Sequence, residues 1–345
     1  MRITKTGMDR LLAQAARFVD AVDRRRLRDR QELGLPETAP TKPGTKVGDG
    51  RAEVLADKIA DLEEIANHQS EALKEIKGRL ADAQALTARA YEHAQEWPAQ
   101  LRRVREDPDY ARAWEDPNPL ISVRIATYQN AELLCERALA SVLRQGYENW
   151  ECIVVGDAEP DTTAERVETI GDPRIRFLNL PFRGPYPDDP VTRWKVAGIA
   201  AMNRGAREAR GAWIAPLDHD DEWEDDHIEA LLAHARSSRA ELVYGKLRVR
   251  DAASLRLVNN VVGAWPPVLG EFGLQGTIYH AGLRCFEMDP NARFADEPGD
   301  WNLARRLWEA GVRFAFLDQI VTTYYWAPVD PAGRAWLAEN LGATD

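Results

Sequence analysis

The chain has 345 residues and a formal net charge of −11, with 45 Lys and Arg against 56 Asp and Glu. This acidic balance argues against a general nucleic-acid binder, because no net positive field displaces counterions, and it gives no attraction to anionic membranes. No stretch reaches the roughly 18 consecutive apolar residues of a membrane span, and no signal-peptide core follows the N-terminus. The three cysteines form no C-x-x-C pair, which favours a reducing, cytoplasmic location.

Residues 1–35 predict an amphipathic helix. Residues 8–33 repeat apolar side chains at helical spacing, and the helix ends in a basic run, residues 24–30 (RRRLRDR). We interpret this run as the solvated face of a helix that packs on a partner. A contact with phosphate or lipid headgroups is the alternative, so a peripheral contact at the inner membrane face stays open. Residues 36–52 are rich in Gly, Pro and Thr and predict a flexible linker.

Residues 53–116 carry a heptad pattern. Seam positions with 4-3 spacing fill residues 55–97, across six heptads, and most of them are apolar. This length is typical of a coiled coil, in which the polar seam residue Gln69 would fix the register. We predict a homo-oligomer through this seam; an intramolecular helical hairpin packed on the following domain is the alternative. Pro98 ends the pattern, and the proline-rich residues 107–119 mark a domain boundary.

Residues 117–330 alternate short apolar runs with helical patterns, and residues 331–345 are expected to be a C-terminal tail. The alternation predicts an α/β domain with a mostly parallel sheet. The expected strands are residues 121–126, 151–155, 174–180, 212–217, 241–250, 255–262 and 276–280. The expected helices are residues 133–142, 161–170, 191–210 and 224–236, and one that begins near residue 300.

Polar side chains follow three of these strands. Thr127 and Tyr128 come after the first, Asp157 after the second, and residues 218–221 (DHDD) after the fourth. Ligands of open α/β sheets bind outside the carboxyl ends of the strands, so we expect these side chains to share one site. A single aspartate in such a place is often only the N-cap of the next helix.

The three aspartates within residues 218–221 repel one another unless a cation or hydrogen-bond donors compensate them. A hard divalent cation takes oxygen ligands and often combines one or two carboxylates with substrate phosphates. We therefore predict a metal–diphosphate site, and a solvated, helix-capping acidic loop is the alternative. Asp300 stands at the start of an expected helix, where it is either the N-cap or a catalytic base.

Six short segments together resemble the glycosyltransferase family 2 pattern over about residues 119–327. Each is weak alone, but all six occur in the family's order and at plausible spacing. They are residues 125–130 (IATYQN), 137–145 (RALASVLRQ), 154–159 (VVGDAE), 201–205 (AMNRG), 218–221 (DHDD) and 299–301 (GDW).

This resemblance implies a GT-A fold, which is an open mixed sheet flanked by helices, here preceded by the helical, coiled-coil region. It also implies roles for single residues. Thr127, Tyr128, Asp157, Asn203 and Asp218 would bind the nucleotide-sugar donor.

The same resemblance implies a metal and a base. Asp220 and Asp218 would hold Mn²⁺ or Mg²⁺, and Asp300 would be the general base of an inverting transfer. The donor would be a nucleoside-diphosphate sugar, most often UDP-linked. The acceptor hydroxyl would belong to a glycan, a lipid-linked saccharide or a peptide. The alternative is a non-catalytic GT-A-like scaffold that is assembled through its coiled coil.

The sequence departs from the family pattern at several places. Gly156 replaces one acid of the usual pair, Met202 an arginine that often helps to bind the donor, and Gly299 the glutamate beside the base. Tyr324 lies in the segment where the family usually has a late histidine, and His280 is an alternative ligand. These departures leave room for an altered donor choice or weak activity.

Three tryptophans, Trp223, Trp265 and Trp301, are candidates for apolar platforms under an acceptor sugar ring. Packing in the core is the alternative role for each of them.

Overall fold

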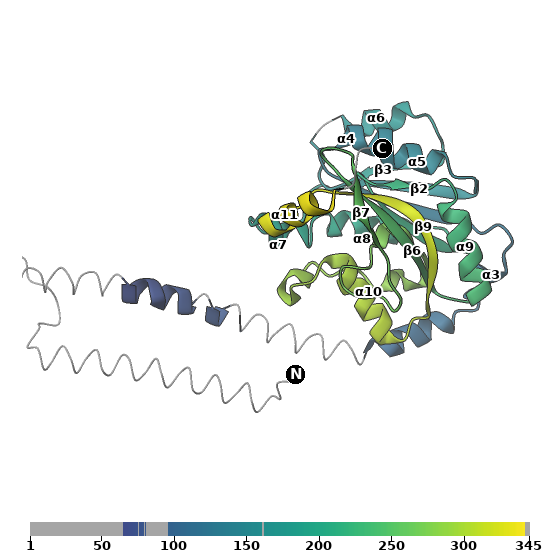
Figure 1. Cartoon of the computed structure of the whole chain (residues 1–345). Helices are drawn as coiled ribbons and strands as arrows, with labels where there is room; N and C mark the ends of the chain where they lie inside the picture. Colours follow the sequence, from purple (N-terminus) through teal and green to yellow (C-terminus); the bar gives the residue numbers. More distant parts are fainter. Residues whose placement is uncertain (1–64, 75, 79, 81–95, 161, 342–345) are drawn as a thin grey trace, which may run out of the picture. The chain divides into compact units, whose positions relative to one another are not determined.

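The structure is a computed structural model that describes residues 65–74, 76–78, 80, 96–160 and 162–341 (Figure 1). Contacts divide the chain into two compact units, Met1–Leu73 and Lys74–Asp345, and each is described by itself. The expected N-terminal helix and linker lie outside the described residues, as does most of the heptad seam. The described residues between 65 and 74 are helical, and almost all of their side chains are exposed.

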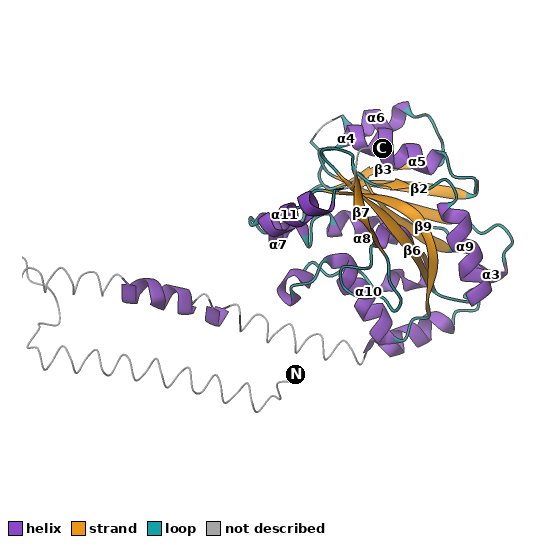
Figure 2. Ribbon diagram, viewed as in Figure 1, coloured by secondary structure: helices purple, strands orange, loops and turns teal. Residues whose placement is uncertain are grey.

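Four parallel strands form one half of the sheet in the order β3-β2-β1-β4. Their bounds are Ile121–Thr127 for β1, Trp150–Gly156 for β2, Ile175–Asn179 for β3 and Trp213–Asp218 for β4. Figure 2 labels β2 and β3 of this half, and β6, β7 and β9 of the other. In register, Thr127 pairs with Gly156, and Ala126 pairs with Asp218. The carboxyl ends of three neighbouring strands therefore meet at one edge, as the sequence predicts.

The other half of the sheet mixes strand directions. β8 runs antiparallel to β4 and to β6, whereas β9 runs parallel to β6. β5 and β7 are short antiparallel additions to β9 and β6. The bounds are Glu222–Trp223 for β5, Leu242–Asp251 for β6, Leu257–Val262 for β7, Thr277–His280 for β8 and Phe314–Trp326 for β9. The described sheet has nine strands, and the predicted open mixed sheet flanked by helices is confirmed.

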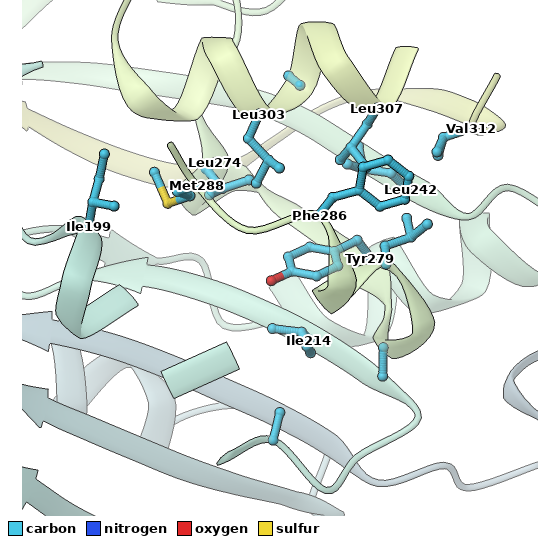
Figure 3. Close-up of a cluster of buried hydrophobic side chains, with 14 of the residues drawn as sticks. Ile199, Ile214, Leu242, Leu274, Tyr279, Phe286, Met288, Leu303, Leu307 and Val312 are labelled. Atoms are coloured by element: carbon cyan, nitrogen blue, oxygen red, sulfur yellow. The ribbon is translucent and has the colours of Figure 1, made fainter. Parts of the chain in front are cut away.

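Helices cover both faces of the sheet because successive side chains of each strand point to opposite sides. Ile121, Val123 and Ile125 of β1 pack in one buried cluster with residues of α5 and α9. Ala126 packs in the other, with residues of α8 and α10, and Figure 3 shows part of this second cluster. The bounds are Ala140–Leu143 for α5, Ile199–Glu208 for α8, His227–Ser238 for α9 and Gly299–Ala310 for α10.

Two expected helices are interrupted. The helix expected at 191–210 is divided into α7 (Pro190–Trp194) and α8, because Gly198 adopts a left-handed conformation with φ of 75° between them. The helix expected at 133–142 runs as α4 (Ala131–Leu133), a π-helical stretch (Leu134–Leu139) and α5. The helix expected at 161–170 is α6 (Thr163–Thr169).

The segment before the sheet packs against the domain. Residues 96–105 are helical, so the helix continues past Pro98, where the heptad pattern was expected to end. Trp97 and Leu101 are buried in the same cluster as α8 and α10. Trp114 of α3 (Arg112–Glu115) is also buried, and its indole N–H donates to the carbonyl of Ala240 at 3.0 Å. These contacts explain why tertiary packing extends the helix beyond the seam.

A buried carboxylate fastens this segment to the sheet. Both Arg105 N–H groups that face Glu241 donate to its two carboxylate oxygens at 2.7 Å, and the backbone N–H of Arg313 donates at 2.7 Å. The Glu241 side chain is fully buried, and these donors hold its pKa below the usual range against the opposing effect of burial.

The C-terminal segment expected to be a tail contains a helix, α11 (Pro331–Asn340). Its Leu337 is buried with Val249 of β6 and Val258 of β7. Among the described residues, no helix is both long and apolar enough to cross a bilayer.

Candidate active site

Three predicted donor-binding residues lie together at the ends of β1 and β2. Thr127 and Asp157 are both buried, and the Thr127 hydroxyl makes no hydrogen bond to a described residue. The guanidinium of Arg183 stacks on the Tyr128 ring at 3.5 Å, and its Nε lies 3.7 Å from the Asp157 carboxylate. The backbone N–H of Gly184 also approaches Asp157, at 3.4 Å. A planar cation, an aromatic ring and a carboxylate therefore lie in contact with one another.

The loops after these two strands are tied together by Glu159. Its carboxylate accepts the backbone N–H of Gln129 at 2.8 and 3.0 Å, and its backbone N–H donates to the side chain of Asn179 at 2.9 Å. Gly156 contacts the same two residues: a Cβ added at Gly156 would lie 2.7 Å from the side chains of both Asn179 and Glu159. This crowding explains why a glycine replaces the acid that the family pattern usually has.

The aspartates at the end of β4 and just after it are close enough to shift one another's pKa values. Burial and then the charge of Asp220 raise the pKa values of both Asp218 and Asp221, and that of Asp221 rises well above its usual range. One Asp221 oxygen accepts the backbone N–H of Tyr325 at 2.9 Å, whereas the other has no partner among the described residues. Arg137 donates to the Asp220 carbonyl at 2.6 Å, and its guanidinium stacks on the Tyr325 ring. Arg137 therefore connects the loop of Asp220 to β9.

Asp300 lies in the first turn of α10. The N-cap of this helix is Pro298, so the expectation that Asp300 caps it is wrong. One Asp300 oxygen accepts the backbone N–H of Trp301 at 2.7 Å. Burial raises the pKa of Asp300 to about 6, a backbone hydrogen bond from Trp301 opposes this shift, and the charge of Asp218 adds to it. The effect of Asp218 places the two carboxylates in one electrostatic environment.

Gly299, which precedes Asp300, is closely packed. A Cβ added at Gly299 would lie 2.8 Å from the end of the Ile199 side chain and 3.1 Å from that of Met288. The glutamate of the family pattern would therefore have to displace these two side chains.

Tyr324 of β9 lies among the four aspartates of the site, although the sequence pattern did not assign it a role. Its pKa is raised by burial and then by the charges of Asp221, Asp220, Asp218 and Asp300, in that order. In the sequence, Tyr324 is marked only by its position in the segment where the family usually has a late histidine. The sequence pattern predicts no strand at β9, so it gives no reason to place Tyr324 near the aspartates.

The other residues that the sequence suggested for binding either lie elsewhere or already contact other protein groups. The Asn203 side-chain N–H donates to the Met288 carbonyl, and its amide oxygen accepts the Met288 backbone N–H, both at 2.9 Å. Both polar atoms of this side chain therefore already have hydrogen-bond partners within the protein. His280 pairs with Trp213 at the opposite end of β4 and contacts the Tyr110 carbonyl at 3.1 Å. Trp223 is buried and stacks on His227, so it offers no platform to a sugar.

The acidic edge was tested for its fit to a metal ion. Among the described residues, no group of three or more His, Cys, Asp or Glu side chains is arranged to hold one. However, Asp218 and Asp220 supply carboxylate oxygens, and a neighbouring Asp221 oxygen lacks a partner. Hard divalent cations accept such oxygens and complete their shell with water and substrate phosphates, so this donor set fits Mg²⁺ or Mn²⁺ when a diphosphate is present.

Comparison with known proteins gives a family match. Residues 122–187 and 191–285 match the family described as glycosyl transferase family 2. The putative colanic acid biosynthesis glycosyl transferase WcaA of Escherichia coli is 34% identical over 34% of this chain and 38% of its own length. The E. coli UDP-Glc:alpha-D-GlcNAc-diphosphoundecaprenol beta-1,3-glucosyltransferase WfgD is 28% identical over 39% of this chain and 49% of its own length. The chain therefore spans less than half the length of these relatives.

A solved structure of the mannosyltransferase PcManGT from Pyrobaculum calidifontis, in complex with GDP-Man and Mn²⁺, is 20% identical to this chain. The superposed region covers 75% of this chain and 72% of the PcManGT chain, with a TM-score of 0.46.

In an open α/β sheet of this kind the ligand site lies outside the carboxyl ends of the parallel strands. The part of the chain that forms this edge, between residues 122 and 285, matches glycosyl transferase family 2.

Proposed function

We propose that this protein is a metal-dependent, inverting glycosyltransferase. It moves a sugar from a nucleoside-diphosphate sugar to a hydroxyl group of a saccharide acceptor. The observation that carries this proposal is that the carboxyl ends of β1, β2 and β4 meet at one sheet edge. The charges of Asp218, Asp220, Asp221 and Asp300 all act on Tyr324, which brings Asp300 into the surroundings of this edge. The match to glycosyl transferase family 2 supports the same reaction class.

The donor fits the edge in two parts. The nucleoside lies against Tyr128 and Asp157, where a carboxylate can accept an N–H of the base and a ring can stack on it. The diphosphate lies over the loop that carries Asp218 and Asp220, which would hold Mn²⁺ or Mg²⁺. A UDP-linked donor is the first choice because the name of the relative WfgD specifies UDP-Glc.

The reaction requires one base on the face of the sugar opposite to the diphosphate. Asp300 accepts the proton of the acceptor hydroxyl while that oxygen forms a bond to the anomeric carbon. The bond from the anomeric carbon to the diphosphate oxygen breaks, and the electron pair leaves with the nucleoside diphosphate. A single displacement of this kind inverts the configuration. A divalent metal held by Asp218 and Asp220 would, when bound, neutralise charge on the departing diphosphate.

The pH profile should report the Asp300 carboxyl. Because its pKa is raised to about 6 and only the ionised form accepts a proton, kcat/KM should rise with pH through about 6 and then level off. The measurement is the initial rate of transfer at low substrate concentration across buffers of constant ionic strength. A rate that stays level down to about pH 4, the usual range of an aspartate, would contradict the assignment.

Two exposed tryptophans support a saccharide acceptor. Trp265, in the loop before β8, and Trp308, on α10, are 53% and 43% exposed, and their rings meet edge to face at 5.7 Å. Trp308 lies eight residues after Asp300 on the same helix, which is about 12 Å along the axis. Apolar sugar faces stack on such rings, so this pair offers a platform for a unit of the acceptor remote from the reacting hydroxyl.

Trp265→Ala should raise the KM for a saccharide acceptor by about fivefold and leave kcat unchanged, because it removes one stacking contact of about 1 kcal/mol. Trp336→Ala is the matched control, since Trp336 is also exposed but lies on α11. Steady-state kinetics with acceptors of increasing length provide the measurement. Equal KM values in the two variants would show that Trp265 does not contact the acceptor.

The experiment that tests the reaction itself is nucleotide-sugar turnover. Purified protein is incubated with UDP-, GDP- and dTDP-sugars, with and without Mn²⁺, and release of the nucleoside diphosphate is followed. Metal-dependent release from one donor supports the enzyme. Neither release nor nucleotide binding with any donor would favour the non-catalytic scaffold.

A second copy of the chain is the proposed partner of the heptad seam. The seam residues Leu73 and Ile76 are helical and are 44% and 58% exposed, which is unfavourable for apolar side chains unless a partner covers them. Leu73→Glu combined with Ile76→Glu should lower the mass measured by light scattering to that of a monomer. Glu71→Gln, outside the seam, is the control and should keep the wild-type mass. An unchanged mass in the double variant would show that the seam does not hold two copies of the chain together.

A further inference from the structure

The helical segment after β1 contains a π-helical stretch that carries an arginine. Residues Leu134–Leu139 are π-helical, between α4 and α5, and Leu134, Ala138 and Leu139 of this stretch are buried. A π-helical turn is rare, and such turns occur frequently at functional sites. Arg137 is the basic residue of this stretch, and the proposed reaction assigns it no role. The burial of its neighbours fixes the backbone from which the Arg137 side chain extends.

The Arg137 guanidinium contacts two segments that are distant from it in the sequence. Its Nη1 donates a hydrogen bond to the main-chain carbonyl of Asp220 at 2.6 Å, and its Cζ lies 3.6 Å from the centre of the Tyr325 ring. A hydrogen bond from a charged donor is stronger than one between neutral groups, and a cation is attracted to the face of an aromatic ring. Arg137 therefore binds one peptide group of the acidic loop, residues 218–221, and one ring of β9 at the same time.

Tyr325 binds the same loop from β9. Its backbone N–H donates to Asp221 Oδ1 at 2.9 Å, and its hydroxyl donates to Glu222 Oε2 at 3.1 Å. Asp220, Asp221 and Glu222 are consecutive, so three successive residues each contact Arg137 or Tyr325. The stacking of Arg137 on Tyr325 joins these contacts into one connected set, which fixes the main chain that carries Asp220.

The contact with Arg137 leaves the Asp220 carboxylate available. Arg137 binds the carbonyl, and no group of the described residues forms a hydrogen bond or an ion pair with the carboxylate of Asp220. The charge of Arg137 still acts on the loop. Burial and then the charges of Asp220 and Asp218 raise the pKa of Asp221, whereas the hydrogen bond from Tyr325 and the charge of Arg137 oppose that rise. A guanidinium bound to the Asp220 carboxylate would compete with a metal for its oxygens, but this guanidinium binds the peptide instead.

We propose that Arg137 is a positioning residue of the proposed metal site. By fixing the Asp220 peptide against β9, it sets the direction in which the loop presents the carboxylates of Asp218 and Asp220 to a divalent cation and the donor diphosphate. Removal of a group that orients metal ligands typically lowers metal affinity or activity by about 10- to 100-fold. This role rests on the proposed function, because it requires that the acidic loop binds a metal.

Arg137→Met in the full chain tests this role, because it removes the hydrogen bond and the charge. UDP, GDP and dTDP are titrated calorimetrically in Mn²⁺ and in a chelator. Affinity in Mn²⁺ should fall by about 10- to 100-fold, whereas binding in the chelator, at Tyr128 and Asp157, should not change. Arg137→Lys retains a charged donor and should recover most of the loss. Arg166→Met, at an exposed position of α6, is the matched control and should bind as the wild type does.

The outcomes separate this role from the proposed function. If the wild type binds none of the three nucleotides more tightly in Mn²⁺ than in the chelator, the proposed metal site is absent and the role of Arg137 is overturned with it. If the wild type shows that dependence on Mn²⁺ and Arg137→Met retains it in full, only the role of Arg137 is overturned. Equal losses in Mn²⁺ and in the chelator would also overturn it, since they would indicate a general disturbance of the fold.

Tyr325→Leu provides an independent variant, which decides the question if Arg137→Met does not fold. It removes the ring on which Arg137 stacks but keeps the backbone N–H that binds Asp221, so it should weaken nucleotide binding in Mn²⁺ and not in the chelator. Tyr325→Phe keeps the ring, loses only the contact with Glu222 and should stay close to the wild type. Equal affinities of the Leu and Phe variants in Mn²⁺ would contradict a positioning role for the stacked pair.

Discussion

Asp300→Asn should reduce transfer by about 10²–10⁴-fold while leaving donor affinity unchanged. The amide occupies the same space in the first turn of α10 and can still accept the backbone N–H of Trp301, but it cannot take a proton from the acceptor hydroxyl. The proposed donor site is formed by residues of other elements, at the ends of β1, β2 and β4. The measurement pairs calorimetric titration of the donor with single-turnover transfer.

The control for this substitution is Glu309→Gln, which removes a carboxylate from the other end of the same helix, where Glu309 pairs with Arg305. It should leave both binding and transfer at the wild-type level. Full transfer by the Asp300→Asn protein would show that another group accepts the proton. Loss of donor affinity in that variant would instead assign Asp300 to the donor pocket.

Asp220→Ala should weaken metal-dependent donor binding by about 30-fold or more, because it removes one of the two proposed carboxylate ligands of the metal. It also removes a negative charge that raises the pKa values of Asp218 and Asp221, so those two carboxyl groups should ionise more readily. The metal-independent part of nucleotide binding, at Tyr128 and Asp157, should persist. Titration of the nucleoside diphosphate with Mn²⁺ and with a chelator separates the two parts.

Asp225→Ala is the matched control for this experiment. Asp225 lies on the same loop region, but its side chain is mostly exposed and pairs with Arg144 on the surface. Its removal should change neither metal dependence nor affinity. If Asp220→Ala binds the donor as tightly as this control does in Mn²⁺, Asp220 is not a ligand of the metal.

The parallel half of the sheet and its carboxyl edge could be predicted because they depend on local pattern. Each of β1, β2 and β4 is a short buried apolar run followed by polar residues, and parallel strands joined by helices place those ends together. The positions of Thr127, Asp157 and Asp218 follow from this rule alone. For the same reason the family resemblance, which rests on these segments, agrees with the fold.

The mixed half of the sheet could not be predicted in this way. β9 has thirteen residues, Phe314–Trp326, and most are only partly buried, so no clear alternation identifies it. Its pairing with β6 is a contact between distant segments, with two register shifts along its length. Tyr324 enters the site through that pairing, and a local pattern holds no information about it.

Packing also assigned roles that residue type alone left open. His280 and Trp223 have side chains suited to a ligand and to a sugar platform, yet both are buried in aromatic clusters away from the acidic edge. Asn203 belongs to a donor-binding motif of the family, and its amide is used by the backbone of Met288. In each case the deciding factor is which neighbour the fold brings within hydrogen-bond or stacking distance.

By itself, the sequence determined the α/β class, the edge at which the site lies and the acidic residues that follow each strand, because strand periodicity and strand ends are local properties. The family resemblance implied that Asp300 acts beside these aspartates, and the tertiary structure brings it into the electrostatic surroundings of Asp218 from a distant helix. Only the tertiary structure showed that the charges of the four aspartates act on Tyr324. It alone also showed that Arg124 is buried within the sheet, where its charge acts on Asp218. Burial and electrostatic coupling depend on contacts between segments far apart in the chain, and no spacing of residues along the sequence specifies them.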